Sequence, residues 1–232
     1  MKNPMKRGMD VLAAAVLFSS VAAGTSQAAL ILFSDKTDFL AETGASDATG
    51  PGLLPDLGSV GLAPVVLGDV TLQSASGNSL FVGTSGSAVV NDDWTLRLPG
   101  PDIAISGFEH LDVSVNLASP AFSFGFDFVE PELDPNVNAA FAESTFTVTL
   151  LSGGMFVDSF LFSRPNDSAE FVGVWSTAAF DGIEIRETTG GIENEFFGEF
   201  YAGTQRVPEP ASILLLVLGS VGIAARHRRD RA

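Results

Sequence analysis

From Asp69 onward, apolar and polar residues alternate in short segments that are separated by turn-forming residues. Such alternation is typical of β-strands that bury one face only. The pattern is clearest at residues 122–128, where four phenylalanines alternate with small or polar residues, and at 145–150, where threonines alternate with apolar residues. A glycine pair at 153–154 separates the second segment from another apolar one at 155–162 and predicts a β-hairpin.

The number and spacing of these segments predict an all-β fold, an antiparallel two-layer sandwich of the jelly-roll or lectin-like kind. The phenylalanine stripes are expected to face the core, because a phenylalanine on an open face gains nothing without a partner. Further strands are predicted at 69–74, 79–83, 87–90, 94–98, 103–106, 111–117, 170–175, 183–187 and 196–201.

One short N-terminal helix is predicted at residues 34–42. Ser34 can cap it, acidic residues occupy its first turn, and Phe39 and Leu40 supply an apolar side. We expect this helix to lie across an end of the sheet. Residues 43–68 are rich in glycine and proline and are expected to form a long surface connection.

The N-terminal segment has the order of a secretory signal. Basic residues come first, an apolar run follows at 11–21, and small residues lead up to Ala28. The apolar run is too short to span a bilayer, which needs roughly 20 residues. We therefore expect cleavage after Ala28, with Ala29 as the alternative position.

The C-terminal segment combines two prolines with an apolar stretch and a basic end. Proline cannot sit inside a helix, but Pro210 can open one, so a short transmembrane helix is predicted at 211–225. The arginines behind it resist translocation and should stop the tail in the membrane with its end in the cytoplasm. These membrane-stop residues are Arg226, Arg228, Arg229 and Arg231.

The motif Pro208-Glu209-Pro210, followed by a short apolar helix and a basic end, resembles the PEP-CTERM sorting signal of Gram-negative bacteria. The resemblance implies that an exosortase, a membrane transpeptidase-like enzyme, recognises the motif after the secretion machinery has placed the tail in the inner membrane. It further implies cutting near the motif and delivery to the cell surface or the exopolysaccharide matrix. The chain then divides into a signal peptide (1–28), a β-sandwich domain (29–206) and a sorting signal (207–232).

The charge of the region between the two signals limits its partners. The whole chain has a formal net charge of −16, but residues 29–207 hold only five basic residues against 25 acidic ones, a formal charge of −20. Such a field repels nucleic acid and anionic lipid and favours cations. The chain has no cysteine, so neither disulfides nor thiolate metal sites are available to it.

Calcium is the cofactor that this composition suits, because hard cations prefer several oxygen ligands. Asp134, Asn136 and Asn138 have the one-three-five spacing of a calcium loop. The loop is incomplete, because Ala139 replaces its turn glycine and Thr145 stands where a bidentate glutamate belongs. A second candidate cluster is Glu193, Asn194 and Glu195. The alternative interpretation of both clusters is a solvated acidic turn.

Catalytic motifs are scarce. Residues 29–207 contain one histidine, His110, and no Gly-x-Ser-x-Gly elbow, which argues against a Ser-His-Asp hydrolase. Paired carboxylates keep a glycoside-active enzyme open, but sequence selects no pair. The candidate sugar-contacting rings are Trp94, Trp175 and Tyr201, because each has a polar edge.

These observations favour an exported, non-enzymatic structural or interaction module associated with extracellular polysaccharide. The alternative from another class is a calcium-dependent carbohydrate-binding domain, and a glycoside-active enzyme is the third hypothesis.

Overall fold

The computed structural model describes residues 28–50, 58–77, 79–82, 112–130, 133–134, 139–140, 144–165, 168–189 and 195–205. These residues form thirteen strands and one helix. The elements are β1 (Leu30–Phe33), α1 (Lys36–Thr43), β2 (Ser46–Asp47), β3 (Gly58–Gly61), β4 (Val65–Leu67), β5 (Val70–Ser74), β6 (Leu80–Val82), β7 (Val113–Val129), β8 (Leu133–Asp134), β9 (Ala139–Ala140), β10 (Thr145–Ser152), β11 (Met155–Phe162), β12 (Glu170–Thr189) and β13 (Phe196–Gly203).

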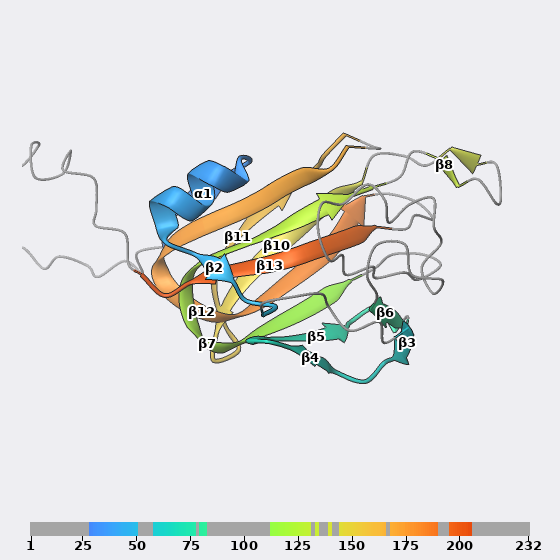
Figure 1. The fold of residues 1–232 in the computed structure, drawn as a ribbon, viewed down its shortest axis with the longest axis horizontal. Helices are drawn as coiled ribbons and strands as arrows, with labels where there is room; N and C mark the ends of the chain where they lie inside the picture. Colours follow the sequence, from blue (N-terminus) through green and yellow to red (C-terminus); the bar gives the residue numbers. More distant parts are fainter. Residues whose placement is uncertain are drawn as a thin grey trace, which may run out of the picture.

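Two long antiparallel strands, β7 and β12, pair along most of their length and bend together (Figure 1). The register shifts twice at the bend, between Trp175 and Phe180 and between Phe180 and Gly182. Such irregularities let a strand turn a corner without ending. One sheet is thereby folded over into two layers.

The remaining strands of the large sheet extend one layer or the other. The first layer contains the start of β7 and the end of β12, with β4 and β5 on one side and β10 and β11 on the other. The second layer contains the end of β7 and the start of β12, extended by β1 on one side and by β13 and β2 on the other. Every pairing is antiparallel, so the predicted all-β antiparallel sandwich with one short helix is confirmed. Two small sheets, β3–β6 and β8–β9, complete the described strands.

Phenylalanine rings fill the space between the layers. Phe128 on the second layer lies 5.3 Å, between ring centroids, from Phe146 and from Phe162, which belong to the first layer. Phe124, Phe126 and Phe128 are all buried, so the expectation that this stripe faces the core is confirmed for these three rings, whereas the fourth ring, Phe122, is only partly buried. Ring pairs in these tilted and edge-on geometries add specific stabilisation to the area they bury.

The predicted hairpin is present between β10 and β11. Its two-residue turn is formed by Gly153 and Gly154, whose φ angles are +56° and +79°. A type I′ turn needs positive φ at both central residues, and glycine adopts such values without steric cost. The sequence motif therefore placed this turn correctly.

Other boundaries differ from the prediction. The segments at 111–117 and 122–128 are one strand, β7, and those at 170–175 and 183–187 are one strand, β12. The alternation lapses at the bends, which made each continuous strand look like two. The prediction that 43–68 is only a connection is wrong in part, because β2, β3 and β4 fall within it. The strands predicted at 87–90, 94–98 and 103–106 lie outside the described residues.

Helix α1 lies on the outer face of the second layer rather than across an end of the sheet (Figure 1). Asp35, not Ser34, caps it by accepting a hydrogen bond from the Asp38 backbone N–H at 2.9 Å. Phe39 anchors it and is fully buried, with its ring centroid 5.2 Å from that of Phe171. Phe39 is therefore the fully buried apolar contact between the helix and the sheet surface beneath it, and Leu40 packs partly buried against the same cluster.

Glycines on two neighbouring strands leave room on that surface for the aromatic rings. A Cβ atom at Gly173 would lie 2.7 Å from the Phe171 ring and 2.9 Å from the Phe39 ring. A Cβ atom at Gly125 would lie 2.5 Å from the Phe171 ring. The missing side chains are therefore what lets the two rings rest against the sheet backbone.

Replacing Gly173 by alanine is expected to lower the free energy of unfolding by about 1–3 kcal/mol, because the added methyl overpacks the contact below α1. The matched control is Gly182→Ala in the same strand, where the nearest atom to the new Cβ is at an ordinary 3.4 Å. The control should change the free energy by at most about 0.5 kcal/mol. Chemical denaturation measures the free energy of unfolding of both variants. An equal decrease in the two would contradict the close contact between Gly173 and the rings below the helix.

Candidate functional site

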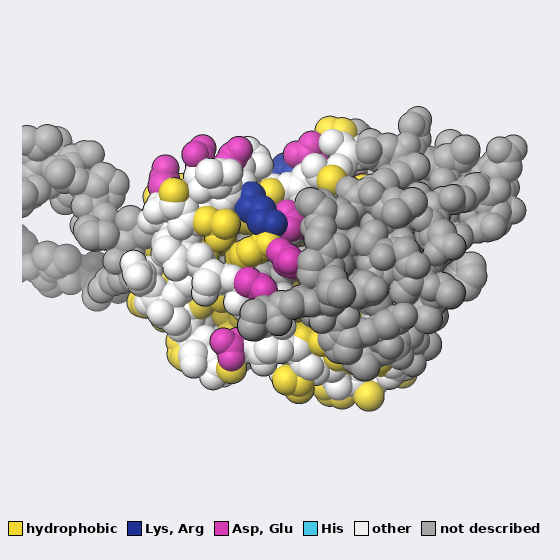
Figure 2. All heavy atoms as spheres, viewed as in Figure 1, with side chains coloured by type: hydrophobic (Ala, Val, Ile, Leu, Met, Phe, Trp, Pro, Cys, Tyr) yellow, Lys and Arg dark blue, Asp and Glu magenta, His cyan; other side chains and the backbone are white. Residues whose placement is uncertain are grey.

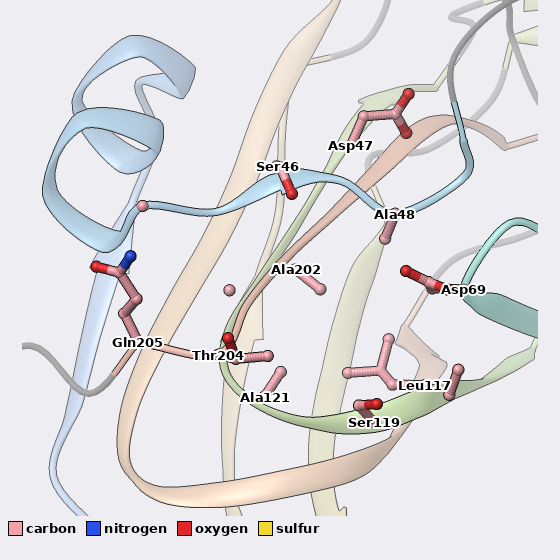
Figure 3. Close-up of a pocket in the computed structure, with 13 residues that line it drawn as sticks. Ser46, Asp47, Ala48, Asp69, Leu117, Ser119, Ala121, Ala202, Thr204 and Gln205 are labelled. Atoms are coloured by element: carbon pink, nitrogen blue, oxygen red, sulfur yellow. The ribbon is translucent and has the colours of Figure 1, made fainter.

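A groove lies at the end of the sandwich where the long strands bend, and we call it the bend groove (Figure 3). Its volume is about 180 Å³. It is enclosed by the segment around β2, the β4–β5 turn, the bend of β7 and the end of β13. The polar residues of its lining are Ser46, Asp47, Asp69, Ser119, Thr204 and Gln205.

Three backbone hydrogen bonds hold these segments together. Ala48 N–H donates to Phe200 O at 2.8 Å, Asp69 N–H to Ala48 O at 2.7 Å, and Ala118 N–H to Asp69 O at 2.8 Å. Gly68 makes the close approach feasible, because it has φ +56° and its Cβ would lie 2.5 Å from Ala48 O. The position of the Asp69 backbone is therefore fixed from both sides.

The two carboxylates of the bend groove differ in their roles. Asp47 Oδ1 accepts hydrogen bonds from the Thr49 backbone N–H and hydroxyl, at 2.8 and 2.5 Å, so it organises its own turn. Figure 3 shows the Asp69 side chain pointing into the groove and the Asp47 carboxylate pointing away from its centre. Together with the neighbouring hydroxyls and the Gln205 amide, Asp69 offers hydrogen bonds to a small hydroxylated ligand.

A polar cluster lies beside this groove, below the start of α1, and we call it the Lys36 cluster. Lys36 Nζ is 2.7 Å from Asp127 Oδ2, 3.8 Å from Glu199 Oε2 and 4.4 Å from the centroid of the Tyr201 ring. The Tyr201 hydroxyl donates to Glu199. Figure 2 shows basic side-chain atoms set among acidic ones on this face. These contacts tie α1 to β7 and β13 and satisfy the charges internally.

The environment of the Lys36 cluster shifts two pKa values. Burial raises the pKa of Asp127 above its ordinary 3.8, and the hydrogen bond from Lys36 partly offsets this. The pKa of Tyr201 is raised far above its ordinary 10. Burial is the largest cause, and the hydrogen bond to Glu199 is the second. The phenol therefore stays protonated in the folded state throughout the neutral range.

Tyr201 is the only tyrosine of the chain, so its ionisation can be followed directly by absorbance near 295 nm. In the folded protein no phenolate absorbance should appear as the pH passes 10, whereas the unfolded chain should titrate there. Because folding raises this pKa, the stability that the retained proton supplies is complete below pH 10 and is lost as the pH rises above it. A titration near pH 10 with the fold intact would contradict the buried hydrogen bond to Glu199.

The sequence-predicted rings do not form an open platform. Trp175 and Tyr201 are 4% and 5% exposed, and Tyr201 is covered by Phe39, Phe171 and Lys36. The sugar-stacking hypothesis for these two rings is therefore corrected, because strand alternation put them on an outer face that other residues cover. Trp94 lies outside the described residues.

The calcium candidates are mostly outside the described residues. Asp134 belongs to β8, but its side chain is not described, and Glu195 is fully buried rather than solvated. Within the described ranges no three His, Cys, Asp or Glu side chains gather closely enough to hold a metal ion. The calcium loop stays a prediction. The candidates outside the description are Asn136, Asn138, Glu193 and Asn194.

No sequence pattern predicted the bend groove or the Lys36 cluster. Asp69, Ser119 and Thr204 come from three separate segments, and each resembles an ordinary turn or strand-end residue. The sorting motif 208–210, the segment 211–225 and the arginines behind it lie outside the described residues. In the part of the chain that is described, no helix is long and apolar enough to cross a membrane.

The described strands define a β-sandwich protein. Residues 206–229 match the family model described as the PEP-CTERM protein-sorting motif. The chain thus carries the PEP-CTERM signal that its C-terminal sequence predicts, which marks it as a protein exported and sorted by an exosortase.

Among solved structures, the chain is similar to carbohydrate binding modules of family 29. Two are mutants of CBM29-2, one of them complexed with cellulohexaose. Each is 11% identical over 77% of this chain, covering 92% and 93% of the module, with a TM-score of 0.31. A third, described as carbohydrate binding module family29, is 12% identical over 77% of this chain and 90% of the module, with a TM-score of 0.30. Similarity at this level carries no argument about ligands. No curated protein matches the chain.

Proposed function

We propose that this protein works outside the cell as a non-enzymatic interaction module associated with exopolysaccharide, after exosortase has processed its C-terminal signal. The observation that carries the proposal is the sorting motif at residues 206–229 directly behind a β-sandwich. The membrane holds the C-terminal segment only until processing, and the sandwich is the part delivered.

The positions of the two signals support release of an intact fold. Ala29 N–H donates to the Thr177 hydroxyl at 3.0 Å, and Thr177 N–H donates to Ala29 O at 3.1 Å. Cleavage after Ala28 would therefore leave a new N-terminus that is already bonded to β12. At the other end β13 finishes at Gly203, before the matched motif begins at residue 206. Cutting at both signals would remove no strand of the sandwich.

Mass spectrometry of the protein recovered outside the producing cells tests this proposal, because it reports both termini at once. We expect an N-terminus at Ala29 and a C-terminus near residues 208–210. A variant with Pro208, Glu209 and Pro210 replaced by alanine should remain with the cells. Recovery of the wild-type chain in the cytosol with both ends intact would overturn the proposal.

The bend groove favours carbohydrate binding as the second candidate function. Its carboxylate, hydroxyl and amide groups are those that hydrogen-bond sugar hydroxyls. Oligosaccharides from the host's own polysaccharide should bind without release of reducing sugar, and Asp69→Asn should weaken the binding. Calcium dependence would be refuted by a melting temperature that neither millimolar calcium nor a chelator changes.

A further inference from the structure

A second groove opens along the side of the sandwich, between the edge strands β1 and β11, and we call it the seam groove. Its volume is about 200 Å³. Each of these strands ends one of the two layers, so the groove is the gap where the layers meet without a connecting strand. The residues that line it include Leu32, Phe160, Phe162, Arg164 and Val172.

The lining of the seam groove combines apolar side chains with the polar side chains of Ser34 and Arg164. Leu32 on β1 is 54% exposed and lies opposite Val174, a residue of the main core, so its side chain is on the core side of the strand. Phe162 and Val172 deeper in the groove are buried and belong to the main core. An apolar chain that enters here would cover the exposed Leu32 side chain and continue the core, which is favourable in proportion to the area removed from water.

One cation, Arg164, lines this groove, and its contacts differ from those of the other basic residues described. Lys36 pairs with Asp127, and Arg186 lies 3.5 Å from Glu184 and 3.8 Å from Asp112. Arg164 makes no ion pair with any carboxylate in the described ranges.

Among the described residues, the guanidinium of Arg164 bonds to two backbone carbonyls. It donates to Ser163 O at 3.1 Å and to Phe171 O at 3.3 Å. Its Nε atom is buried and has no hydrogen-bond partner among the residues described. Although the net charge of the chain is −16, an arginine with no carboxylate partner among the described residues offers an anion from outside a local point of attachment in this groove.

We propose that the seam groove binds an acyl chain that ends in a free carboxylate, with the chain between β1 and β11 and the carboxylate on Arg164. In another protein, an engineered apolar cavity of about 150 Å³ binds benzene. The seam groove, at about 200 Å³, therefore has room for a chain of roughly eight carbons. A planar guanidinium pairs well with a carboxylate, and this pairing is stronger at a partly desolvated site. The proposed ligand class is therefore a medium-chain fatty acid, which is separate from any polysaccharide contact at the bend groove.

Isothermal titration calorimetry with octanoate tests the proposal on the full-length chain held in phosphatidylcholine nanodiscs, with empty nanodiscs as the blank. From butanoate to octanoate the affinity should rise about fourfold per added methylene and then level off. Methyl octanoate has the same chain without the charge, so its affinity should be lower by a factor of about ten or more. Equal binding of the ester and the acid would overturn the role of Arg164, and no octanoate binding above the blank would overturn the site.

Two substitutions with matched controls separate binding from folding. Arg164→Gln should reduce octanoate affinity about tenfold or more, whereas Arg186→Gln, which lies away from the groove, should not. Leu32→Ser should also weaken binding, whereas Val66→Ser, at a valine that is 70% exposed on β4, should not. Circular dichroism confirms that each variant is folded before it is titrated.

A spectroscopic measurement tests the ion pair itself. Octanoate labelled with ¹³C at the carboxyl carbon should titrate at a lower pH when bound than when free, because a neighbouring guanidinium favours the ionised form. In Arg164→Gln this difference should disappear. A bound carboxyl that titrates like the free acid in the wild-type protein would contradict the proposal.

Discussion

Phe128→Ala is expected to lower the free energy of unfolding by about 3–5 kcal/mol, the range for removing a buried aromatic ring from a packed core. Phe128 is fully buried, and its ring lies 5.3 Å from Phe146, 5.3 Å from Phe162 and 5.4 Å from Phe197, between centroids. These partners belong to both layers, so alanine would leave a cavity at the place where the layers meet. The melting temperature should fall by roughly 6–20 °C.

Phe156→Ala is the matched control for this prediction. Phe156 has the same side chain but is 61% exposed on the edge strand β11. Its loss should change the free energy of unfolding by no more than about 0.5 kcal/mol. Urea denaturation followed by circular dichroism measures both variants. A small loss for Phe128→Ala would mean that the two layers do not pack through this ring.

Neutralising the C-terminal arginines is expected to have the largest effect on sorting. With Arg226, Arg228, Arg229 and Arg231 replaced by glutamine, residues 226–232 no longer contain the permanent positive charges that resist translocation. We predict that the variant is no longer arrested in the membrane and that its C-terminus is not processed. Cell fractionation with detection of the sandwich domain measures the change.

The same four positions replaced by lysine provide the control. Lysine keeps the charge and changes the side chain, so arrest and processing should match the wild-type protein. Failure of the lysine variant would show that the arginine side chains themselves are recognised. Unchanged fractionation of the glutamine variant would contradict the proposed topology.

Local pattern was enough to predict the strand-rich fold, because period-two alternation records which face of a strand is buried. The stripe Phe124, Phe126 and Phe128 and the Gly153-Gly154 turn are properties of a few consecutive residues, and the structure places them as predicted. The bends of β7 and β12 were missed because alternation says nothing about whether a strand continues through a corner. The helix cap was also mispredicted, because both Ser34 and Asp35 have side chains that can cap and local pattern does not choose between them. In the structure Asp35 is the cap.

The C-terminal signal could be read from sequence alone, because a sorting enzyme recognises a linear motif and the membrane responds to length and charge. The bend groove, the Lys36 cluster and the seam groove could not. Asp69 meets Ala48 and Ala118, Lys36 meets Asp127 and Glu199, and Arg164 meets Leu32 only after long-range strand pairing. Sequence therefore determined where the chain is sent and what kind of fold it has. Only tertiary structure decided which side chains share a groove, because that depends on contacts between residues far apart in the chain.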